Sequence, residues 1–134
     1  MNQKEQKGRL NGEEGFTLIE IIAVLIVLGI LAAVAVPKYM NMTEDAKNKA
    51  AVGAVAEGKA RVNQYAASYI LKSGSIPDAE KVAEAMNKAF TDAGDFSLEY
   101  KESGKTAVTI TANGLKATPA AGGTASGTVK LPTT

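Results

Sequence analysis

The feature that most constrains this chain is an apolar segment near its N-terminus. Residues 16–36 read FTLIEIIAVLIVLGILAAVAV, 21 residues in which Glu20 is the single charged side chain. As a helix rising about 1.5 Å per residue the segment is roughly 32 Å long, which matches the roughly 30 Å hydrocarbon core of a bilayer. Because the helix is apolar on every side, it needs lipid or a bundle of other helices around it, rather than one face of a soluble core.

The residues before this segment are polar and have no hydrophobic period, so residues 1–15 are predicted to be an unstructured leader. Three basic leader residues are balanced by three lysines beyond the segment, Lys38, Lys47 and Lys49, so the positive charges leave the orientation nearly tied. A short basic leader directly before an apolar segment favours a cytoplasmic N-terminus. The residues from Pro37 onward are then exported.

A cleaved signal peptide is the alternative interpretation of the same stretch. Ala33-Val34-Ala35 has the small-x-small pattern that signal peptidase needs, and a charged region precedes the apolar segment. Against this interpretation, the apolar segment is longer than the usual signal-peptide core and carries a carboxylate near its start.

Glu20 is the one residue in the segment whose burial in lipid is costly. A carboxylate at the centre of a membrane helix costs roughly 2.5–3.5 kcal/mol, and less near the end of the helix, where the side chain can reach the interface. Two interpretations remain open. Glu20 is either an interfacial charge without a role, or a group that awaits a positive partner inside an apolar assembly.

The stretch Gly15-Phe16-Thr17-Leu18-Ile19-Glu20, followed by an unbroken apolar segment and Pro37, resembles the N-terminal signature of type IV pilins and the related type II secretion pseudopilins. The resemblance covers about 27 residues, 15–41. It implies that a prepilin peptidase removes the leader after Gly15 and that Phe16 becomes the new, usually N-methylated, N-terminus. It also implies that Glu20 meets the N-terminal amine of a neighbouring subunit during filament assembly.

The resemblance further implies three regions and a set of partners. Residues 1–15 are the cleaved leader, 16–36 the transmembrane and assembly half of a long N-terminal helix, and 37–134 a globular pilin-like domain. The partners are further copies of this chain in a helical filament, the prepilin peptidase, an assembly platform and its motor. The protein lies in the bacterial inner membrane before assembly and on the cell surface afterwards. Gly29 and Pro37 weaken the helix locally, which allows a bend at the membrane exit. The resemblance also implies a role in subunit assembly, in which the segment between them can lose helicity inside a filament.

Composition excludes most other chemistry. The chain has no cysteine and no histidine, so it has no disulfide, no thiolate or imidazole metal ligand and no cysteine nucleophile. Basic and acidic side chains number 15 and 14, so no strong field attracts nucleic acid. We therefore expect no catalytic residue, no cofactor, no metal site and no specific nucleic-acid binding. Asp92 and Asp95 match no calcium loop in their spacing.

Beyond Pro37 the helical pattern continues over residues 39–72. Apolar residues at spacings of three, four or seven are predicted to face the core: Val52, Val55, Val62, Ala66 and Tyr69. Charged residues are predicted to form the solvated face: Glu44, Asp45, Lys47, Lys49, Glu57 and Arg61. Ser73-Gly74-Ser75 is predicted to end this helix, with Gly74 as a left-handed cap. A second helix is predicted from the N-cap Asp78 to Gly94, with these residues inward: Val82, Met86, Ala89, Phe90 and Ala93.

From Phe96 the hydrophobic period changes to two, which predicts strands. Phe96, Leu98 and Tyr100 alternate with polar residues, Ser103-Gly104 is a predicted turn, and Val108 and Ile110 alternate with threonines. Asn113-Gly114 is predicted to be a two-residue turn into a strand at residues 115–118. Residues 119–127 are predicted to form a flexible loop without a core of its own, and 128–131 a last strand. The fold class is α+β, and the resemblance implies a small antiparallel sheet packed on the long helix.

Three functional hypotheses follow from the sequence. The first is the structural subunit of a type IV pilus, with roles such as adhesion or motility. The second is a minor pilin or a pseudopilin of a type II secretion system. The third belongs to another class, a membrane-tethered or secreted binding domain, which needs neither Glu20 nor Phe16 at the junction. We predict that the protein is not an enzyme.

Overall fold

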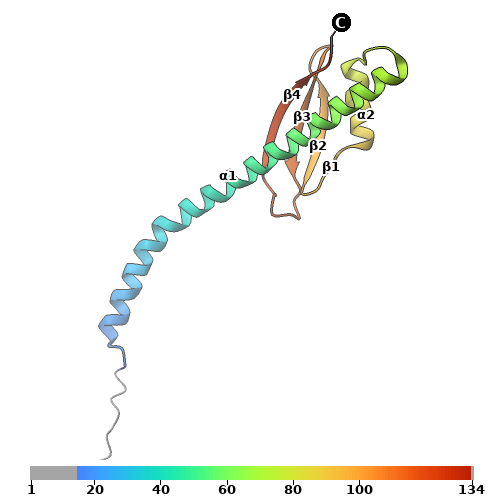
Figure 1. Cartoon of the computed structure of the whole chain (residues 1–134). Coiled ribbons are helices and arrows are strands. Elements are labelled where there is room, and N and C mark those ends of the chain that lie inside the picture. The colour runs from blue at the N-terminus through green and yellow to red at the C-terminus, as the bar shows by residue number, and fades with distance from the viewer. Residues whose placement is uncertain (1–14, 134) are drawn as a thin grey trace, which may run out of the picture. The chain divides into compact units, whose positions relative to one another are not determined.

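A computed structural model describes residues 15–133, and its elements follow the expected α+β order (Figure 1). Two helices precede four strands: α1 (Leu18–Ser73), α2 (Ala79–Ala89), β1 (Asp92–Ala93), β2 (Phe96–Glu102), β3 (Ala107–Gly114) and β4 (Thr124–Lys130). The chain divides into two compact units, one ending at Lys38 and the other comprising the residues from Tyr39 onward. The predicted leader lies outside the described residues except for Gly15.

Helix α1 joins both predicted helical stretches and keeps Pro37 within it. Proline has no N–H to donate to the carbonyl of Ala33, so one backbone hydrogen bond is missing at that turn. An 18-residue window of α1 near the N-terminus has a mean hydropathy of 3.0 and is not buried, a composition that suits a membrane span or a signal sequence. The helix ends as predicted. Gly74 has a φ of +68°, and its N–H donates to the carbonyl of Ile70 at 2.8 Å.

The four strands form one antiparallel sheet in sequence order, a meander. Tyr100 of β2 pairs with Ile110 of β3, and Ile110 in turn pairs with Gly127 of β4. The predicted turn between β2 and β3 is confirmed, because Gly104 lies there with a φ of +75°. The change of hydrophobic period at Phe96 therefore marks the start of the sheet correctly.

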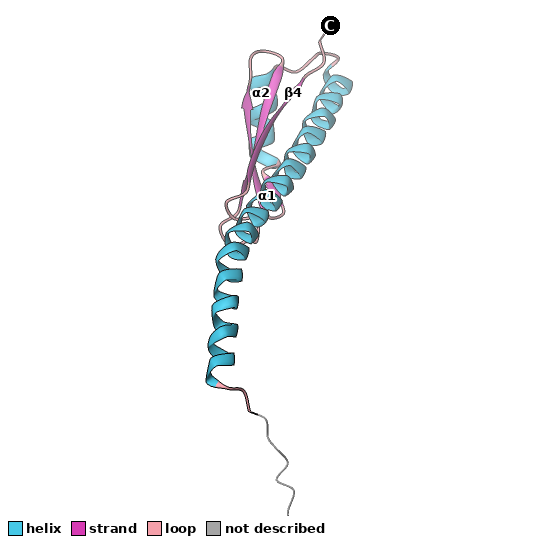
Figure 2. Ribbon diagram, turned by 90° about the vertical axis from the view of Figure 1, so that its left-hand side faces the viewer, coloured by secondary structure: helices cyan, strands magenta, loops and turns pink. Residues whose placement is uncertain are grey.

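The core lies between one face of the sheet and the part of α1 that belongs to the second unit (Figure 2). Helix α2 packs beside β2. Alternation places one set of strand side chains on this face. The largest fully buried side chains come from all three parts: Tyr100, Met86, Ile110, Val62, Val82 and Val108. The inward positions predicted for β2 and β3 are confirmed.

Two glycines let α1 approach the sheet closely. A Cβ on Gly58 of α1 would lie 2.8 Å from Cγ2 of Ile110, and a Cβ on Gly127 of β4 would lie 3.0 Å from Cγ1 of Val55. A third glycine acts in the loop before β4. A Cβ on Gly123 would lie 2.8 Å from the carbonyl oxygen of Lys47. The distance between helix and sheet is thus set by the absence of side chains at these positions.

Gly58 and Gly53 form a matched pair within α1. Alanine at position 58 gains about 1 kcal/mol of helix propensity but must displace the fully buried Ile110, so we expect a net loss of about 1–2 kcal/mol in unfolding free energy. Alanine at position 53, where a Cβ meets nothing within 4 Å, should instead stabilise by about 0.5–1 kcal/mol. Chemical denaturation followed by circular dichroism measures both. Equal effects of the two substitutions would show that Gly58 is not a packing contact.

The prediction that the second helix runs to Gly94 is wrong. Helix α2 ends at Ala89, where the Phe90 N–H donates to the carbonyl of Met86, and β1 follows at once. Gly94 belongs to the turn between β1 and β2, where its N–H donates to Oδ1 of Asp92. Asp78 is the N-cap as predicted, and Val82 and Met86 are buried. Ala89, the last residue of α2, and Phe90, its C-cap, are exposed rather than inward.

The predictions after Ile110 are wrong in three places. Asn113 and Gly114 are the last residues of β3 rather than a turn, because Gly114 lies against the backbone of Ala120 instead of adopting a positive φ. Residues 115–118 form no strand. Strand β4 starts at Thr124 and ends at Lys130, so much of the predicted loop is strand, and Ala120 within that loop is buried in the core.

The predicted faces of α1 are correct at Val55, Val62 and Ala66 but wrong at Val52, which is 59% exposed. The positions that contact the sheet most closely carry small residues, Ala51, Ala54 and Gly58, which a search for large apolar side chains passes over. Two predicted solvated residues are half-buried. Lys47 donates to the carbonyl of Ala121 at 2.9 Å, and Arg61 also binds backbone carbonyls.

Candidate functional site

The residues of the predicted processing and assembly motif lie together at the start of α1. Gly15, Phe16 and Thr17 precede the helix, and Phe16 is 82% exposed. The Thr17 N–H donates to Oε2 of Glu20 at 2.9 Å, and the Glu20 N–H donates to Oγ1 of Thr17 at 3.3 Å. This reciprocal pair is a capping box, which satisfies two backbone donors at the helix start. Glu20 is therefore held in place by its own helix.

The sequence interpretation missed Thr17 as a structural partner of Glu20. The signal was present, because a threonine followed three residues later by a glutamate before an apolar run is the sequence signature of a capping box. In the structure Glu20 uses one carboxylate oxygen, Oε2, for this bond. A carboxylate accepts several hydrogen bonds, so Oε1 of Glu20 remains able to accept from a second donor, such as a positively charged group.

Gly29 and Pro37 do not join this group. Both lie within α1, and Pro37 is 17 residues beyond Glu20, about 25 Å along a helix. A Cβ on Gly29 would meet nothing within 4 Å. Their contribution is to the backbone, through lower helix propensity at Gly29 and the missing N–H at Pro37.

The first half of α1 presents large apolar side chains to its surroundings throughout. Those more than half exposed include Leu18, Ile19, Val24, Leu25, Ile26, Val27, Leu28, Ile30, Leu31, Val34 and Val36. Soluble monomers rarely expose apolar patches larger than a few hundred Å², so this surface needs lipid or other apolar helices to cover it. Small residues between them, such as Gly29 and Ala33, allow close helix approach.

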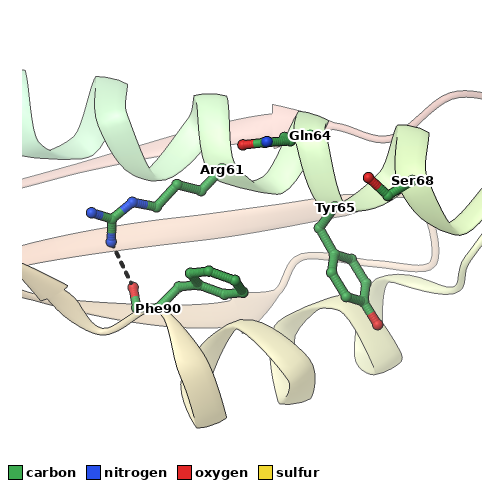
Figure 3. Close-up of a pocket in the computed structure, with 5 residues that line it drawn as sticks. All are labelled: Arg61, Gln64, Tyr65, Ser68 and Phe90. Carbon is green, nitrogen blue, oxygen red and sulfur yellow. Dashed lines mark hydrogen bonds between the residues drawn. The ribbon is translucent and has the colours of Figure 1, made fainter.

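In the second unit, a hollow of about 200 Å³ is lined by Arg61, Gln64, Tyr65, Ser68 and Phe90 (Figure 3). The guanidinium of Arg61 donates to the carbonyls of Phe90, at 3.2 Å, and Asp92, at 2.7 Å, and pairs with Glu57. The charge of Arg61 thus holds the end of α2 and the start of β1 against α1. Among residues 15–133, no three His, Cys, Asp or Glu side chains are placed to hold a metal ion.

Tyr100 is buried, and its hydroxyl donates at 3.0 Å to the carbonyl of Phe90, one of the residues that line this hollow. Burial raises the pKa of Tyr100, and nearby Arg61 opposes that rise only in part. Because the folded-state pKa lies above the unfolded value, Tyr100 stabilises the fold fully below about pH 10. That contribution is lost as pH rises through the folded-state pKa.

Tyr100→Phe tests this pH dependence. The substitution removes the hydroxyl and its hydrogen bond, so we expect a loss of about 1 kcal/mol in unfolding free energy at neutral pH. The stability of the wild type should fall above about pH 10 more steeply than that of the variant, so the two curves converge. Thermal unfolding measured across this range reports both. A constant difference between the curves at all pH values would contradict the assignment.

Comparison with known proteins finds one matching family model and several similar proteins. Residues 10–36 match the family model described as the prokaryotic N-terminal methylation motif. Similar proteins include fimbrial protein Q of Moraxella bovis, 35% identical over 63% of this chain and 49% of its own length. The type IV major pilin protein PilE1 of Neisseria gonorrhoeae is 34% identical over 77% of this chain and 56% of its own length.

A third relative belongs to a secretion system. The type II secretion system core protein G of Pseudomonas aeruginosa is 37% identical over 57% of this chain and 51% of its own length. The chain therefore spans about half the length of these relatives. No solved structure matches it significantly.

Proposed function

Because residues 10–36 match the N-terminal methylation motif and the chain is similar to type IV pilins and to a type II secretion core protein, we propose that it is the structural subunit of a type IV pilus filament. The observation that carries the proposal is the junction itself. Gly15-Phe16 is followed by the capped Thr17–Glu20 pair and an apolar helix, all within or next to the matched methylation motif. A membrane-tethered or secreted binding domain does not require this combination of features.

In this proposal a prepilin peptidase cleaves after Gly15 and the new N-terminus at Phe16 is N-methylated. Phe16 is exposed and precedes the helix, as a cleavage and modification site requires. Until assembly, the first half of α1 lies in the inner membrane, where lipid covers its apolar side chains.

Filament assembly then exchanges lipid for the α1 helices of other copies. This exchange is nearly neutral for apolar side chains, so close packing and polar pairing must supply specificity. Glu20 receives the N-terminal ammonium of a neighbouring subunit, and Gly29 and Pro37 give that part of α1 a locally weakened helix. Extraction from the membrane and growth of the filament at the cell surface require an assembly platform and a motor.

A pseudopilin role in type II secretion is the second candidate, and the similarity to protein G favours it. Both roles use the same N-terminal motif. A pilus subunit forms long filaments on the surface of the native host at the natural expression level of the protein, whereas a pseudopilin does not. Electron microscopy of wild-type and deletion strains distinguishes the two roles.

The experiment that tests the proposal is the intact mass and N-terminal sequence of the mature protein from its native host. We expect a chain that begins at Phe16 and carries a methyl group. A chain that begins at Val36, after the Ala33-Val34-Ala35 pattern, would instead identify a signal peptide and overturn the filament proposal.

A further inference from the structure

The two edges of the sheet are treated differently by the rest of the second unit. On the outer edge of β2, the Leu98 N–H donates to the Thr91 carbonyl at 2.7 Å. The Asn87 side chain of α2 binds both backbone groups of Tyr100, donating to its carbonyl at 2.7 Å and accepting from its N–H at 2.9 Å. This edge is therefore closed, as native sheets commonly close edges that would otherwise pair with another chain.

The outer edge of β4 is open. The Gly114 N–H donates to the Gly123 carbonyl and the Leu131 N–H to the Thr106 carbonyl, so alternation turns the odd-numbered residues of β4 toward β3. The even-numbered residues point outward. Thr124 donates its N–H to Oδ1 of Asn48, but within residues 15–133 no hydrogen bond reaches the outward N–H groups of Ser126, Thr128 and Lys130. These three positions present a free ladder for one more strand.

One flank of α1 lies above this edge. Asn48 binds the start of β4, and Cε of Lys59 lies 2.9 Å from the place of a Cβ on Gly127. Val52 follows Asn48 by one turn and precedes Lys59 by two, so it lies on the same flank. It belongs to the apolar stripe by its spacing, yet the four strands do not cover it. A fifth strand, about 4.8 Å beyond β4, would lie beneath Val52.

The charges at this edge indicate the partner. Lys59 and Lys130 flank it, and neither belongs to an ion pair among the described residues, in which the pairs are Arg61–Glu57, Lys88–Glu84 and Lys101–Glu99. Two copies of β4 paired antiparallel about Thr128 would place their Gly127 residues about 8 Å apart, each with a Lys59 ammonium group beside it, and like charges so arranged repel. The outer edge of β4 therefore disfavours pairing with a second copy of this chain and favours a negatively charged partner.

We propose that the outer edge of β4, with the α1 flank of Val52 and Lys59, binds an extended acidic segment of another protein as a fifth strand. Lys130 lies on the face of the sheet away from α1, where the segment carries a carboxylate to meet it. On the face toward α1 the segment carries an apolar side chain over Val52 and, at another position of the same face, a carboxylate beside Lys59. This interaction surface is independent of the filament role, since it uses none of the N-terminal motif.

The test uses the full chain in zwitterionic detergent micelles and a capped seven-residue peptide of valine and glutamate. Its α1-facing positions carry valine and then glutamate, and its other positions carry glutamate. Hydrogen exchange followed by NMR should show new protection at the amides of Ser126, Thr128 and Lys130. The amides of Ala125, Gly127 and Val129 face β3 and should already be protected without peptide. A peptide with lysine in place of glutamate is the matched control and should bind at least about tenfold more weakly.

Two substitutions separate the ladder from the charge. Thr128→Pro removes an outward N–H without breaking a bond to β3, so binding should weaken by about tenfold or more, whereas Thr128→Ala keeps the N–H and should bind normally. Lys59→Glu should weaken the glutamate peptide by about tenfold and strengthen the lysine peptide. This charge reversal decides the matter if Thr128→Pro does not fold.

Three results would overturn the proposal. The first is unchanged exchange at Ser126, Thr128 and Lys130 at saturating peptide. The second is equal binding of both peptides to wild type and Lys59→Glu. The third is protection of these amides without peptide in a dimeric protein, which would assign the edge to a second copy.

Discussion

Leucine at position 20 should leave the mature chain in the inner membrane and abolish filaments. The substitution removes both functions that the structure and the proposed assembly give to Glu20. It deletes the acceptor for the Thr17 N–H, and it deletes the charge that would meet a neighbouring ammonium group. An ammonium group left unpaired in an apolar bundle is strongly destabilising, by about 3–5 kcal/mol. Electron microscopy of a strain without wild-type subunit measures the loss.

Glu20→Gln separates the two functions. Glutamine can complete a capping box with its amide oxygen, but it carries no charge. If pairing with the ammonium drives assembly, the glutamine and leucine variants should both lack filaments. Thr17→Val, which removes the Oγ1 acceptor while leaving the charge, should then still assemble. Normal filaments from Glu20→Leu would refute a role for Glu20 in assembly.

Gly114→Ala should destabilise the second unit more than any other glycine-to-alanine change in the sheet. A Cβ at this position would lie 1.9 Å from the carbonyl oxygen of Ala120 and 2.6 Å from its carbonyl carbon. These are backbone atoms of a loop that is tied down by the bond between Gly114 and Gly123, so the overlap cannot be relieved by a rotamer change. We expect a loss of about 3 kcal/mol or more.

Thermal unfolding followed by circular dichroism measures this effect. A loss of about 3 kcal/mol lowers the midpoint by roughly 12–24 °C for a domain of this length. Lys116→Ala, an exposed position in the same loop, is the control and should change stability by no more than about 0.5 kcal/mol. A near-native midpoint for Gly114→Ala would mean that the loop does not pack on β3 as described.

The sequence was most informative where one strong local signal acts alone. The apolar segment, the cap at Gly74 and the alternation in β2 and β3 were all predicted. Each depends on the hydrophobic period or on the backbone preference of residues that are neighbours in the sequence. The capping box of Thr17 and Glu20 was equally local and could have been read from its spacing. The roles of Gly15, Phe16, Glu20, Gly29 and Pro37 in processing and assembly stay predictions.

The predictions failed where residues distant in sequence decide the backbone. Asn113-Gly114 is a favourable turn dipeptide, yet Ala120 packs against Gly114 and keeps it in strand β3. Residues 124–127 have weak strand propensity, yet pairing with β3 makes them part of β4. The sequence predicts that Arg61 and Lys47 are solvent-exposed charges. In the folded chain both bind backbone carbonyls of segments that are distant in the sequence.

The sequence by itself determined the membrane-length helix, the motif at its start, the α+β order and the lack of disulfides, since each depends on composition or on spacing within one segment. The tertiary structure decided which edge of the sheet is closed and which is open. It also left Val52 uncovered and made Gly58, Gly114 and Gly127 contact positions. The physical reason is that burial and hydrogen bonding of a residue depend on chain segments brought together only by folding, whereas period and propensity do not.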